Sequence, residues 1–232
     1  MPSAIEVQNL RKEFDSDQPI FQSLNFSIKS GERVAILGQN GCGKTTLLKI
    51  LVNLIVPTSG TIKLFGQSAD LRSKKFRQTV AWVPASDQGF YSRLTGLENL
   101  LFFAALDGFS KSQVLKKIDQ FSHFISLEEA QQTPFFLCSS GMKQALSLAR
   151  AFLSDPKILV LDEPTRSLDL IAAQKLREGL KSWPGSPTIV FSTHVEEEAS
   201  YLASRQFELS LGHMIEIDRS EIKKENYAVA AL

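Results

Sequence analysis

The chain has 232 residues, of which 43% are hydrophobic and 22% charged, and its formal net charge is +1. This length suffices for one sizeable core, or for one core with a smaller lobe, and the near-zero charge does not predict a nucleic-acid surface. Two cysteines, Cys42 and Cys138, cannot form a disulfide framework, and the opening MPSAIEVQNLRKEF lacks the apolar core and cleavage site of a signal peptide, so we expect a cytosolic protein.

Short apolar runs, taken in chain order, predict an α/β fold. SLNFSI alternates, with Leu24, Phe26 and Ile28 on one face, and predicts a half-exposed strand, whereas RVAILG, at 33–38, holds a continuous apolar run and predicts a buried one. Three more buried runs follow at 79–84, 157–164 and 188–194, with helical patterns between them. This order indicates a parallel sheet covered by helices. FELSLGHMIEI, two short runs around Gly212, predicts a hairpin at the sheet edge.

A long helical segment, roughly 86–149, lies between the second and third of the four buried runs. In it Val114, Ile118, Phe121 and Ile125 mark one face of a helix. We interpret the segment as a helical subdomain inserted into a single domain of 1–232, whose α/β core comprises about 1–85 and 150–232. Its most apolar run, LENLLFFAAL, is far too short to span a bilayer.

The strongest motif is GQNGCGKTT, which fits the phosphate-loop pattern of a glycine, four residues, and then glycine, lysine and threonine. It follows a predicted buried strand and precedes a predicted helix, as the mechanism requires. The glycines let the backbone wrap a phosphate, the lysine bridges the β- and γ-phosphates, and the threonine hydroxyl binds Mg²⁺. The predicted phosphate-binding residues are Gly38, Gln39, Asn40, Gly41, Cys42, Gly43, Lys44, Thr45 and Thr46.

An acidic pair ends the predicted strand ILVLDE. After a phosphate loop, Asp162 would complete the Mg²⁺ shell with Thr45, and Glu163 would polarise the attacking water; the alternative is a solvated turn. His194 ends another apolar strand, where its side chain could reach a γ-phosphate, although a lone histidine can equally be structural. Phe14, in LRKEF, could stack under an adenine ring or could be a core aromatic.

A second anion-binding helix start follows at CSSGMKQALSLAR, 138–150, where Ser139, Ser140 and Gly141 precede a regular pattern of Leu and Ala. Such a start offers free backbone N–H groups and the positive end of the helix dipole. With the phosphate loop, the acidic strand end and the strand-end histidine, this stretch resembles the nucleotide-binding subunit of ATP-binding cassette (ABC) transporters, and the resemblance covers nearly the whole chain.

The resemblance implies a P-loop NTPase core: a mainly parallel sheet with helices on both faces, an antiparallel β subdomain and an inserted helical subdomain. It implies ATP and Mg²⁺ as cofactors, and ATP hydrolysis with Lys44, Glu163 and His194 as catalytic residues. The signature helix, through Ser139 and Gly141, would bind the γ-phosphate of an ATP held by the phosphate loop of a second subunit. Two cassettes, identical or pseudo-symmetric, would therefore close head to tail over two nucleotides.

The chain matches the family at some positions and departs from it at others. By the resemblance, Phe14 takes the adenine-stacking position. The family signature is usually Leu-Ser-Gly-Gly-Gln, and here Ser140 and Met142 replace a glycine and the final glutamine. Where the family has a glutamine straight after Val-Pro, this chain has Ala85, and Gln88 is the candidate substitute. The coupling of the core to the helical lobe is therefore in question.

The resemblance also implies an energising subunit that binds a separate integral membrane permease. VPASDQGFYSRLTGLENLLFFAAL, followed by EPTRSLD, looks more like an exporter than a nutrient importer. The protein would lie in the cytoplasm, peripheral at the inner face of the cell membrane, without a nucleic-acid partner. Half of the 16 phenylalanines fall between Phe90 and Phe136, either as lobe core or as the lining of a groove for a permease helix.

Two other functions remain as alternatives. One is a non-transport cassette ATPase acting on a ribosome or nucleic-acid complex, although such proteins usually carry two cassettes or long coiled-coil insertions. The other is a phosphate-loop kinase or GTPase, although the chain has no guanine-reading Asn-Lys-x-Asp motif and the signature would then be unexplained.

Overall fold

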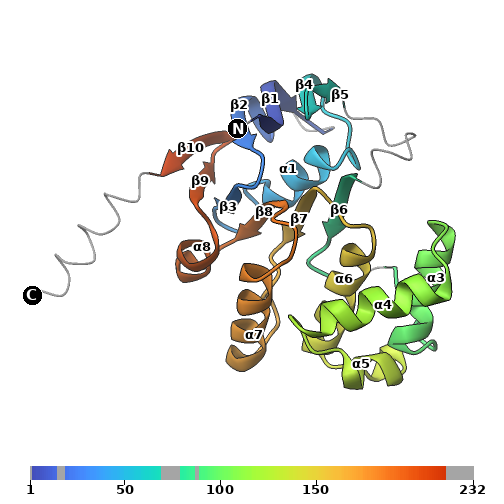
Figure 1. Cartoon of the computed structure of the whole chain (residues 1–232). Helices are drawn as coiled ribbons and strands as arrows, with labels where there is room; N and C mark the ends of the chain where they lie inside the picture. The colour runs from blue at the N-terminus through green and yellow to red at the C-terminus, as the bar shows by residue number, and fades with distance from the viewer. Residues whose placement is uncertain (1, 15–18, 69–78, 87–88, 218–232) are drawn as a thin grey trace, which may run out of the picture.

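The computed structural model describes residues 2–14, 19–68, 79–86 and 89–217, and at its centre lies a six-stranded sheet (Figure 1). The strand order is β10-β9-β3-β8-β7-β6. Neighbours from β9 to β6 are parallel, and β10 pairs antiparallel to β9 at the edge, which confirms the mainly parallel sheet and the terminal hairpin. The strands are β3 (Arg33–Leu37), β6 (Val80–Val83), β7 (Ile158–Asp162), β8 (Thr188–Thr193), β9 (Arg205–Ser210) and β10 (His213–Ile217).

A smaller antiparallel sheet, in the order β2-β1-β4-β5, covers one face of the molecule. Its strands are β1 (Ser3–Lys12), β2 (Phe21–Lys29), β4 (Ser59–Leu64) and β5 (Gln67–Ser68). In β2 the predicted face is present, with Leu24 and Ile28 buried and Phe26 half-buried. Helix α1 (Lys44–Leu51) joins both sheets, because its Leu47 and Leu48 share one buried cluster with residues of each.

The other described helices are α3 (Gly96–Leu106), α4 (Lys111–Ser122), α5 (Glu128–Gln132), the 3₁₀ turn η1 (Phe135–Leu137), α6 (Ser140–Leu153), α7 (Leu170–Lys181) and α8 (Glu196–Leu202). Of these, α6 and α8 pack against the second face of the large sheet, whereas α3, α4 and α5 pack against α6 and gather beyond it in Figure 1. Thr95 and Ser110 begin α3 and α4 with capping boxes. In the described part of the chain, no helix combines the length and the apolar character needed to cross a membrane.

Helix α4 buries Val114, Ile118 and Phe121, as predicted, whereas Ile125 lies beyond the last helical residue, Ser122, and does not belong to this face. The chain turns there because the N–H groups of 124 and 125 bond back to the carbonyl oxygen of Phe121. Helix α6 runs through position 149 without a break. The division into a core and a helical subdomain at 86 and 149 therefore stays a prediction.

The register of the large sheet places three distant segments at one edge. Leu37 of β3 pairs with Thr193 of β8, and Asp162 of β7 pairs with Ser192 of β8. Because these strands are parallel, the loops that follow them emerge on the same side. The phosphate loop, the acidic pair and His194 consequently meet there.

Candidate functional site

The phosphate loop, residues 38–46, joins β3 to α1 and curls around its own lysine, Lys44. Gly43, the N-cap of α1, has a φ of 106°, which glycine adopts without strain. A Cβ at this position would lie 2.7 Å from a side-chain carbon of Ile20. Lys44 is buried, and its Nζ donates hydrogen bonds to the carbonyl oxygens of Gly38 at 2.7 Å and Gln39 at 3.2 Å. The loop thus places one ammonium at the start of a helix, an arrangement that binds anions.

The remaining loop residues lie around this ammonium. They are exposed or half-buried and are therefore accessible to a ligand: Gln39, Asn40, Gly41, Cys42, Thr45 and Thr46. The Cys42 sulfur packs against Gly38, where an added Cβ would lie 2.7 Å from it. Position 38 therefore has no room for a side chain.

Asp162, the last residue of β7, is 3% exposed and accepts hydrogen bonds from two hydroxyls. Thr45 Oγ1 donates to its Oδ2 at 2.8 Å, and Ser192 Oγ donates to its Oδ1 at 2.6 Å. A carboxylate beside a threonine hydroxyl offers hard oxygen donors, which suit Mg²⁺ when phosphate and water complete the shell. Among the described residues, no cluster of three or more His, Cys, Asp or Glu could hold a metal. The donors fit a cation shared with phosphate.

Glu163 follows Asp162 and has a left-handed backbone, with a φ of 45°. This conformation is strained for a residue other than glycine and is typical of functional sites. Its N–H donates to the hydroxyl of Ser192 at 3.0 Å and to the Ser192 carbonyl oxygen at 3.2 Å. Its carboxylate is 8% exposed; Oε1 lies 3.5 Å from Lys44 Nζ, and Oε2 lies 3.4 Å from His194 Nδ1. The structure therefore brings the predicted lysine, glutamate and histidine together.

A hollow of about 340 Å³ opens beside these groups. His194 is 51% exposed in it, so the imidazole is accessible to a ligand. The lining comes from the phosphate loop and from the loops after β7 and β8: Asn40, Glu163, Thr165, Arg166, Ser167, Thr193, His194, Val195 and Glu198.

Two buried polar residues of this region were not predicted from the sequence. Ser192 carries the hydrogen bonds to Asp162 and Glu163 described above. Glu198 is 1% exposed; its Oε2 accepts a bond of 2.6 Å from Thr193 Oγ1, and its Oε1 accepts none from the described residues. Burial raises the pKa of Glu198, and the hydrogen bond from Thr193 opposes this shift. The available sequence signal was the polar end of a buried strand, TIVFSTH.

Phe14 lies beyond the end of β1 and is 49% exposed. The alternative of a core aromatic is therefore wrong. Lys12 Nζ lies 4.5 Å from the centroid of the ring and donates a hydrogen bond to the carbonyl oxygen of Val56 at 3.1 Å. The ring keeps an accessible surface of the kind on which a base can stack.

The second helix start belongs to α6 and faces a different part of the surface. Ser139 is its N-cap, and its hydroxyl accepts a hydrogen bond from the N–H of Met142 at 3.2 Å. Ser139 and Gly141 line a hollow of about 550 Å³ together with residues of α7 such as Ala172, whereas Asn40 lines the hollow beside the phosphate loop. Within one chain, the two anion-binding helix starts thus open onto separate hollows.

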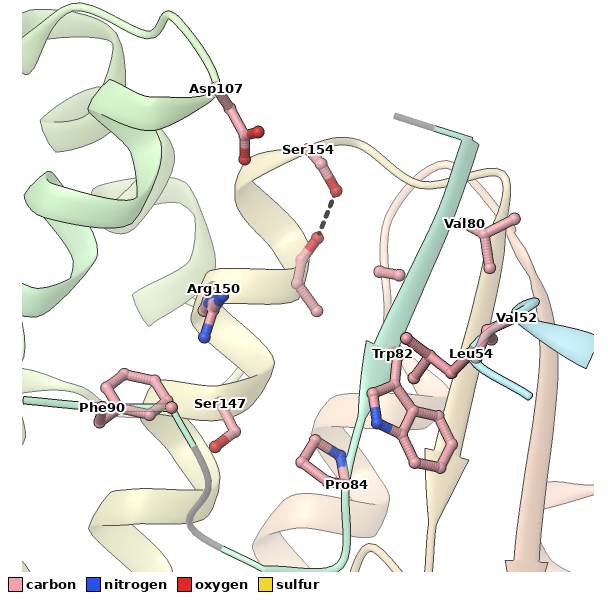
Figure 2. Close-up of a pocket in the computed structure, with 13 residues that line it drawn as sticks. Val52, Leu54, Val80, Trp82, Pro84, Phe90, Asp107, Ser147, Arg150 and Ser154 are labelled. Carbon is pink, nitrogen blue, oxygen red and sulfur yellow. Dashed lines mark hydrogen bonds between the residues drawn. The ribbon is translucent and has the colours of Figure 1, made fainter. Parts of the chain in front are cut away.

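Figure 2 shows a further cleft, of about 530 Å³, between the edge of the large sheet and the helices. Trp82 of β6 and Leu54, which follows α1, lie on one side of the cleft. Phe90 lies on the other side, together with Arg150 of α6. The Arg150 guanidinium carbon is 3.6 Å from the ring centroid of Phe103, and burial lowers the pKa of this arginine. The cleft is therefore partly aromatic, with one cation in its wall.

The phenylalanines of 90–136 divide between core and surface. Phe121 and Phe135 are buried, whereas Phe102 is 39% and Phe136 61% exposed. Core packing thus accounts for only some of them. Ala85 is half-buried beyond β6 and brings no polar group to the site, while Gln88, its candidate substitute, lies outside the described residues.

The chain is similar in sequence to known ATP-binding proteins of transporters. A family model described as ABC transporter matches residues 21–166. The bacitracin transport ATP-binding protein BcrA of Enterococcus faecalis is 35% identical over 230 residues, which cover 97% of this chain and 73% of that protein. The Nod factor export ATP-binding protein I of Burkholderia orbicola (strain AU 1054) is 38% identical over 212 residues, which cover 91% of this chain and 69% of that protein.

A solved structure extends the likeness to the three-dimensional fold. It is a dimeric ATP-binding cassette in a post-hydrolysis state, bound to ADP and Pi, with 25% identity and a TM-score of 0.79 over 92% of this chain and 99% of that chain. The range matched by the family model contains the phosphate loop, the second helix start and the acidic strand end. The chain therefore belongs to the ABC transporter family, as an ATP-binding and ATP-hydrolysing subunit.

Proposed function

We propose that two cassettes bind two ATP molecules between the phosphate loop of one and the α6 start of the other, and that hydrolysis drives export through a separate membrane permease. The observation that carries this proposal is the contrast between the two helix starts. Lys44, Asp162, Glu163 and His194 gather at one sheet edge, whereas the start of α6 opens onto another hollow. A second copy brings the two together.

In this proposal the phosphates lie in the loop 38–46, with Lys44 bridging the β- and γ-phosphates. Thr45 and Asp162 would hold Mg²⁺, which neutralises charge on the phosphates. The pair is already hydrogen-bonded at 2.8 Å, so both oxygens point to one place. Phe14 would stack against adenine at the end of β1.

Glu163 would accept a proton from the attacking water as the water oxygen bonds to the γ-phosphorus and the bond to the ADP oxygen breaks. His194 would contact the γ-phosphate and hold it in line. Burial of the carboxylate and its 3.4 Å separation from the imidazole support these roles. Ser139 and Gly141 of the other copy would bind the γ-phosphate from the opposite side.

A complementation experiment tests the composite site. Lys44→Ala removes the loop's ammonium, and Ser139→Glu places a carboxylate at the α6 start. Each variant alone should be inactive. In a mixture, the heterodimer pairs an intact phosphate loop with an intact α6 start at one of its two sites, because the interface is head to tail. Hydrolysis that returns on mixing supports the proposal, whereas a mixture as inactive as its components contradicts it.

The names of the two relatives, a bacitracin transport protein and a Nod factor export protein, support export as the coupled process. The protein would then lie in the cytoplasm, at the inner face of the cell membrane. A cassette ATPase acting on a ribosome or nucleic-acid complex is not favoured, because these relatives are transport proteins. Co-purification with a multi-spanning membrane protein tests this part.

The cleft in Figure 2 is the proposed contact for a cytoplasmic helix of the permease. Leu54, 53% exposed, lines it and offers apolar surface, and Val56, two residues further along the chain, is 73% exposed. Leu54→Asp should reduce co-purification of the permease while ATP binding persists. Leu211→Asp, at a residue 90% exposed on the β9–β10 turn, is the matched control. Equal effects of the two changes would contradict the contact.

A further inference from the structure

We propose that Arg166 is a positioning residue for hydrolysis: its guanidinium holds the Glu163 carboxylate once nucleotide has drawn away the other basic groups around it. The inference rests on the proposed function, because it takes Glu163 as the group that receives the proton of the attacking water. The surroundings of the carboxylate and the backbone that carries the arginine support this role.

The Glu163 carboxylate has three basic neighbours on three different segments. Lys44 Nζ lies 3.5 Å from Oε1, whereas His194 Nδ1 and Arg166 Nη1 lie 3.4 Å and 3.8 Å from Oε2. Oε2 is buried and accepts no hydrogen bond from any residue that the structure describes. Separations of this size are electrostatic contacts without good hydrogen-bond geometry. The carboxylate therefore lies among three basic groups but is not yet fixed by one.

A tight turn holds Arg166 beside Glu163. The N–H of Arg166 donates to the carbonyl oxygen of Glu163 at 3.0 Å. Two non-glycine residues of this loop have left-handed backbones, Glu163 with a φ of 45° and Ser167 with a φ of 68°. The Arg166 side chain is 57% exposed and lines the hollow that Asn40 and His194 also line. The backbone thus fixes the base of the arginine and leaves its guanidinium free to follow the carboxylate.

Nucleotide binding changes which of these neighbours is available. Lys44 and His194 occupy the positions proposed to meet the β- and γ-phosphates, and the phosphates carry more negative charge than one carboxylate. Arg166 belongs to the same loop as Glu163. Among the described residues, Arg166 is the third basic group within 4.0 Å of the carboxylate, after Lys44 and His194. Two further acids lie nearby, Asp162, which is held by two hydroxyls, and Glu198, which faces Thr193.

An exposed arginine paired at this distance contributes little to folding stability. Its effect should therefore appear in turnover. Loss of one exposed charge contact to the reacting group should lower kcat about threefold to tenfold, while KM for ATP stays within about twofold because the proposed nucleotide contacts do not include Arg166. Arg166→Lys keeps the charge on a flexible stem and should restore at least half of the lost kcat.

The experiment measures steady-state ATP hydrolysis by the full chain for wild type, Arg166→Ala, Arg166→Lys and Arg93→Ala, the last of which removes an exposed arginine elsewhere. The same Arg166→Ala change is also made in a Glu163→Gln background. We expect a fall in kcat for Arg166→Ala alone, rescue by Lys, no effect of Arg93→Ala, and no further loss in the Glu163→Gln background, because Arg166 acts through Glu163.

Two results separate the possible failures. Hydrolysis that survives Glu163→Gln overturns the proposed role of Glu163, and the positioning role falls with it. Hydrolysis that is lost in Glu163→Gln but unchanged in Arg166→Ala overturns the positioning role alone. An equal loss from Arg166→Ala in both backgrounds, or a rise in KM with kcat unchanged, also overturns it, because the arginine would then act on the fold or on the nucleotide.

Discussion

The two anion-binding helix starts of this cassette differ in how far one chain completes them. At the start of α1, Lys44 is 5% exposed and bonded to two carbonyl oxygens, and the neighbouring Asp162 holds two hydroxyls. At the start of α6, Ser139 is exposed and its hydroxyl makes one capping bond. The first site is preorganised within the subunit, whereas the second offers a surface to another molecule. Two helix starts that are both suited to an anion are therefore not equally complete within one chain.

The largest effect should come from the preorganised site. Glu163→Gln removes the carboxylate proposed to receive the proton, so we expect kcat to fall by about a hundredfold or more, with ATP affinity largely retained. The protein should then accumulate as a closed dimer in ATP, which size-exclusion chromatography detects. Glu197→Gln, at an exposed position of α8, is the matched control. A Glu163→Gln variant that stays monomeric in ATP would contradict the composite site.

A change at the start of α6 should affect hydrolysis without affecting the binding of ATP at the start of α1. Ser139→Ala should leave the ATP affinity of the single subunit unchanged, because the phosphate loop is intact, but should lower hydrolysis by about tenfold through the lost hydrogen bond to phosphate. The helix also loses its cap, at about 1 kcal/mol. Ser139→Thr keeps the hydroxyl and should retain activity. Weakened binding of ATP to the monomer would show that the two helix starts are not independent.

A smaller effect is expected at Ala85, which follows β6. Ala85→Gln restores the side chain that the family usually carries there, and we expect hydrolysis to change by less than tenfold, under about 1.4 kcal/mol of barrier. Steady-state ATPase assays measure this directly. A larger gain would mean that the native residue slows the enzyme.

The smallest expected effect is on stability, at the buried Glu198. Because burial raises its pKa, the folded state binds the proton more tightly than the unfolded state does, so this residue favours folding below its ordinary pKa of 4.5 and loses that contribution as pH rises through the folded pKa. Glu198→Gln resembles the protonated form. Its thermal stability should exceed that of wild type near neutral pH, within the roughly 1–3 kcal/mol of a buried unpaired polar group.

Thermal unfolding at several pH values checks this expectation. The advantage of Glu198→Gln should shrink as the pH falls toward 4.5. The same substitution at exposed Glu196 should show no such trend. A Glu198→Gln protein less stable than wild type at neutral pH would mean that the ionised carboxylate is favoured by its surroundings.

The sequence predicted those parts of the site that depend on local order. A phosphate loop needs its residues consecutively between a strand and a helix, so spacing alone located Lys44 and Thr45, and an acidic pair at the end of an apolar strand located Asp162. The parts it did not predict depend on which side chains meet after folding. Ser192 bonds Asp162 across neighbouring strands, and Glu198 of α8 accepts a bond from Thr193; the polar end of the strand TIVFSTH marks a polar region but neither partner.

The fold was predictable for the same reason, with limits at the ends of elements. Continuous apolar runs located β3, β7 and β8, because parallel strands covered on both faces are continuously apolar. The run at 79–84 also forms a strand, but β6 lies at the sheet edge and is only half-buried. Helical periodicity placed Ile125 on the face of α4 although the chain leaves the helix at Ser122. Backbone bonds that turn a chain are not visible in side-chain periodicity. The left-handed backbone at Glu163 had no sequence signal at all.

The parallel register of the large sheet also bears on how such a subunit can change over time. Helices α3 to α6 leave the sheet after β6 and return to it at β7, and these two strands are hydrogen-bonded neighbours. Residues can therefore be inserted or removed between α3 and α5 without altering the pairing of Asp162 with Ser192 or of Leu37 with Thr193. Mutations that fit helices α3 to α5 to a new partner need not move the residues at this sheet edge that are proposed to act in hydrolysis. Related proteins can therefore differ in the partner that these helices bind while they keep the same arrangement of residues at the sheet edge.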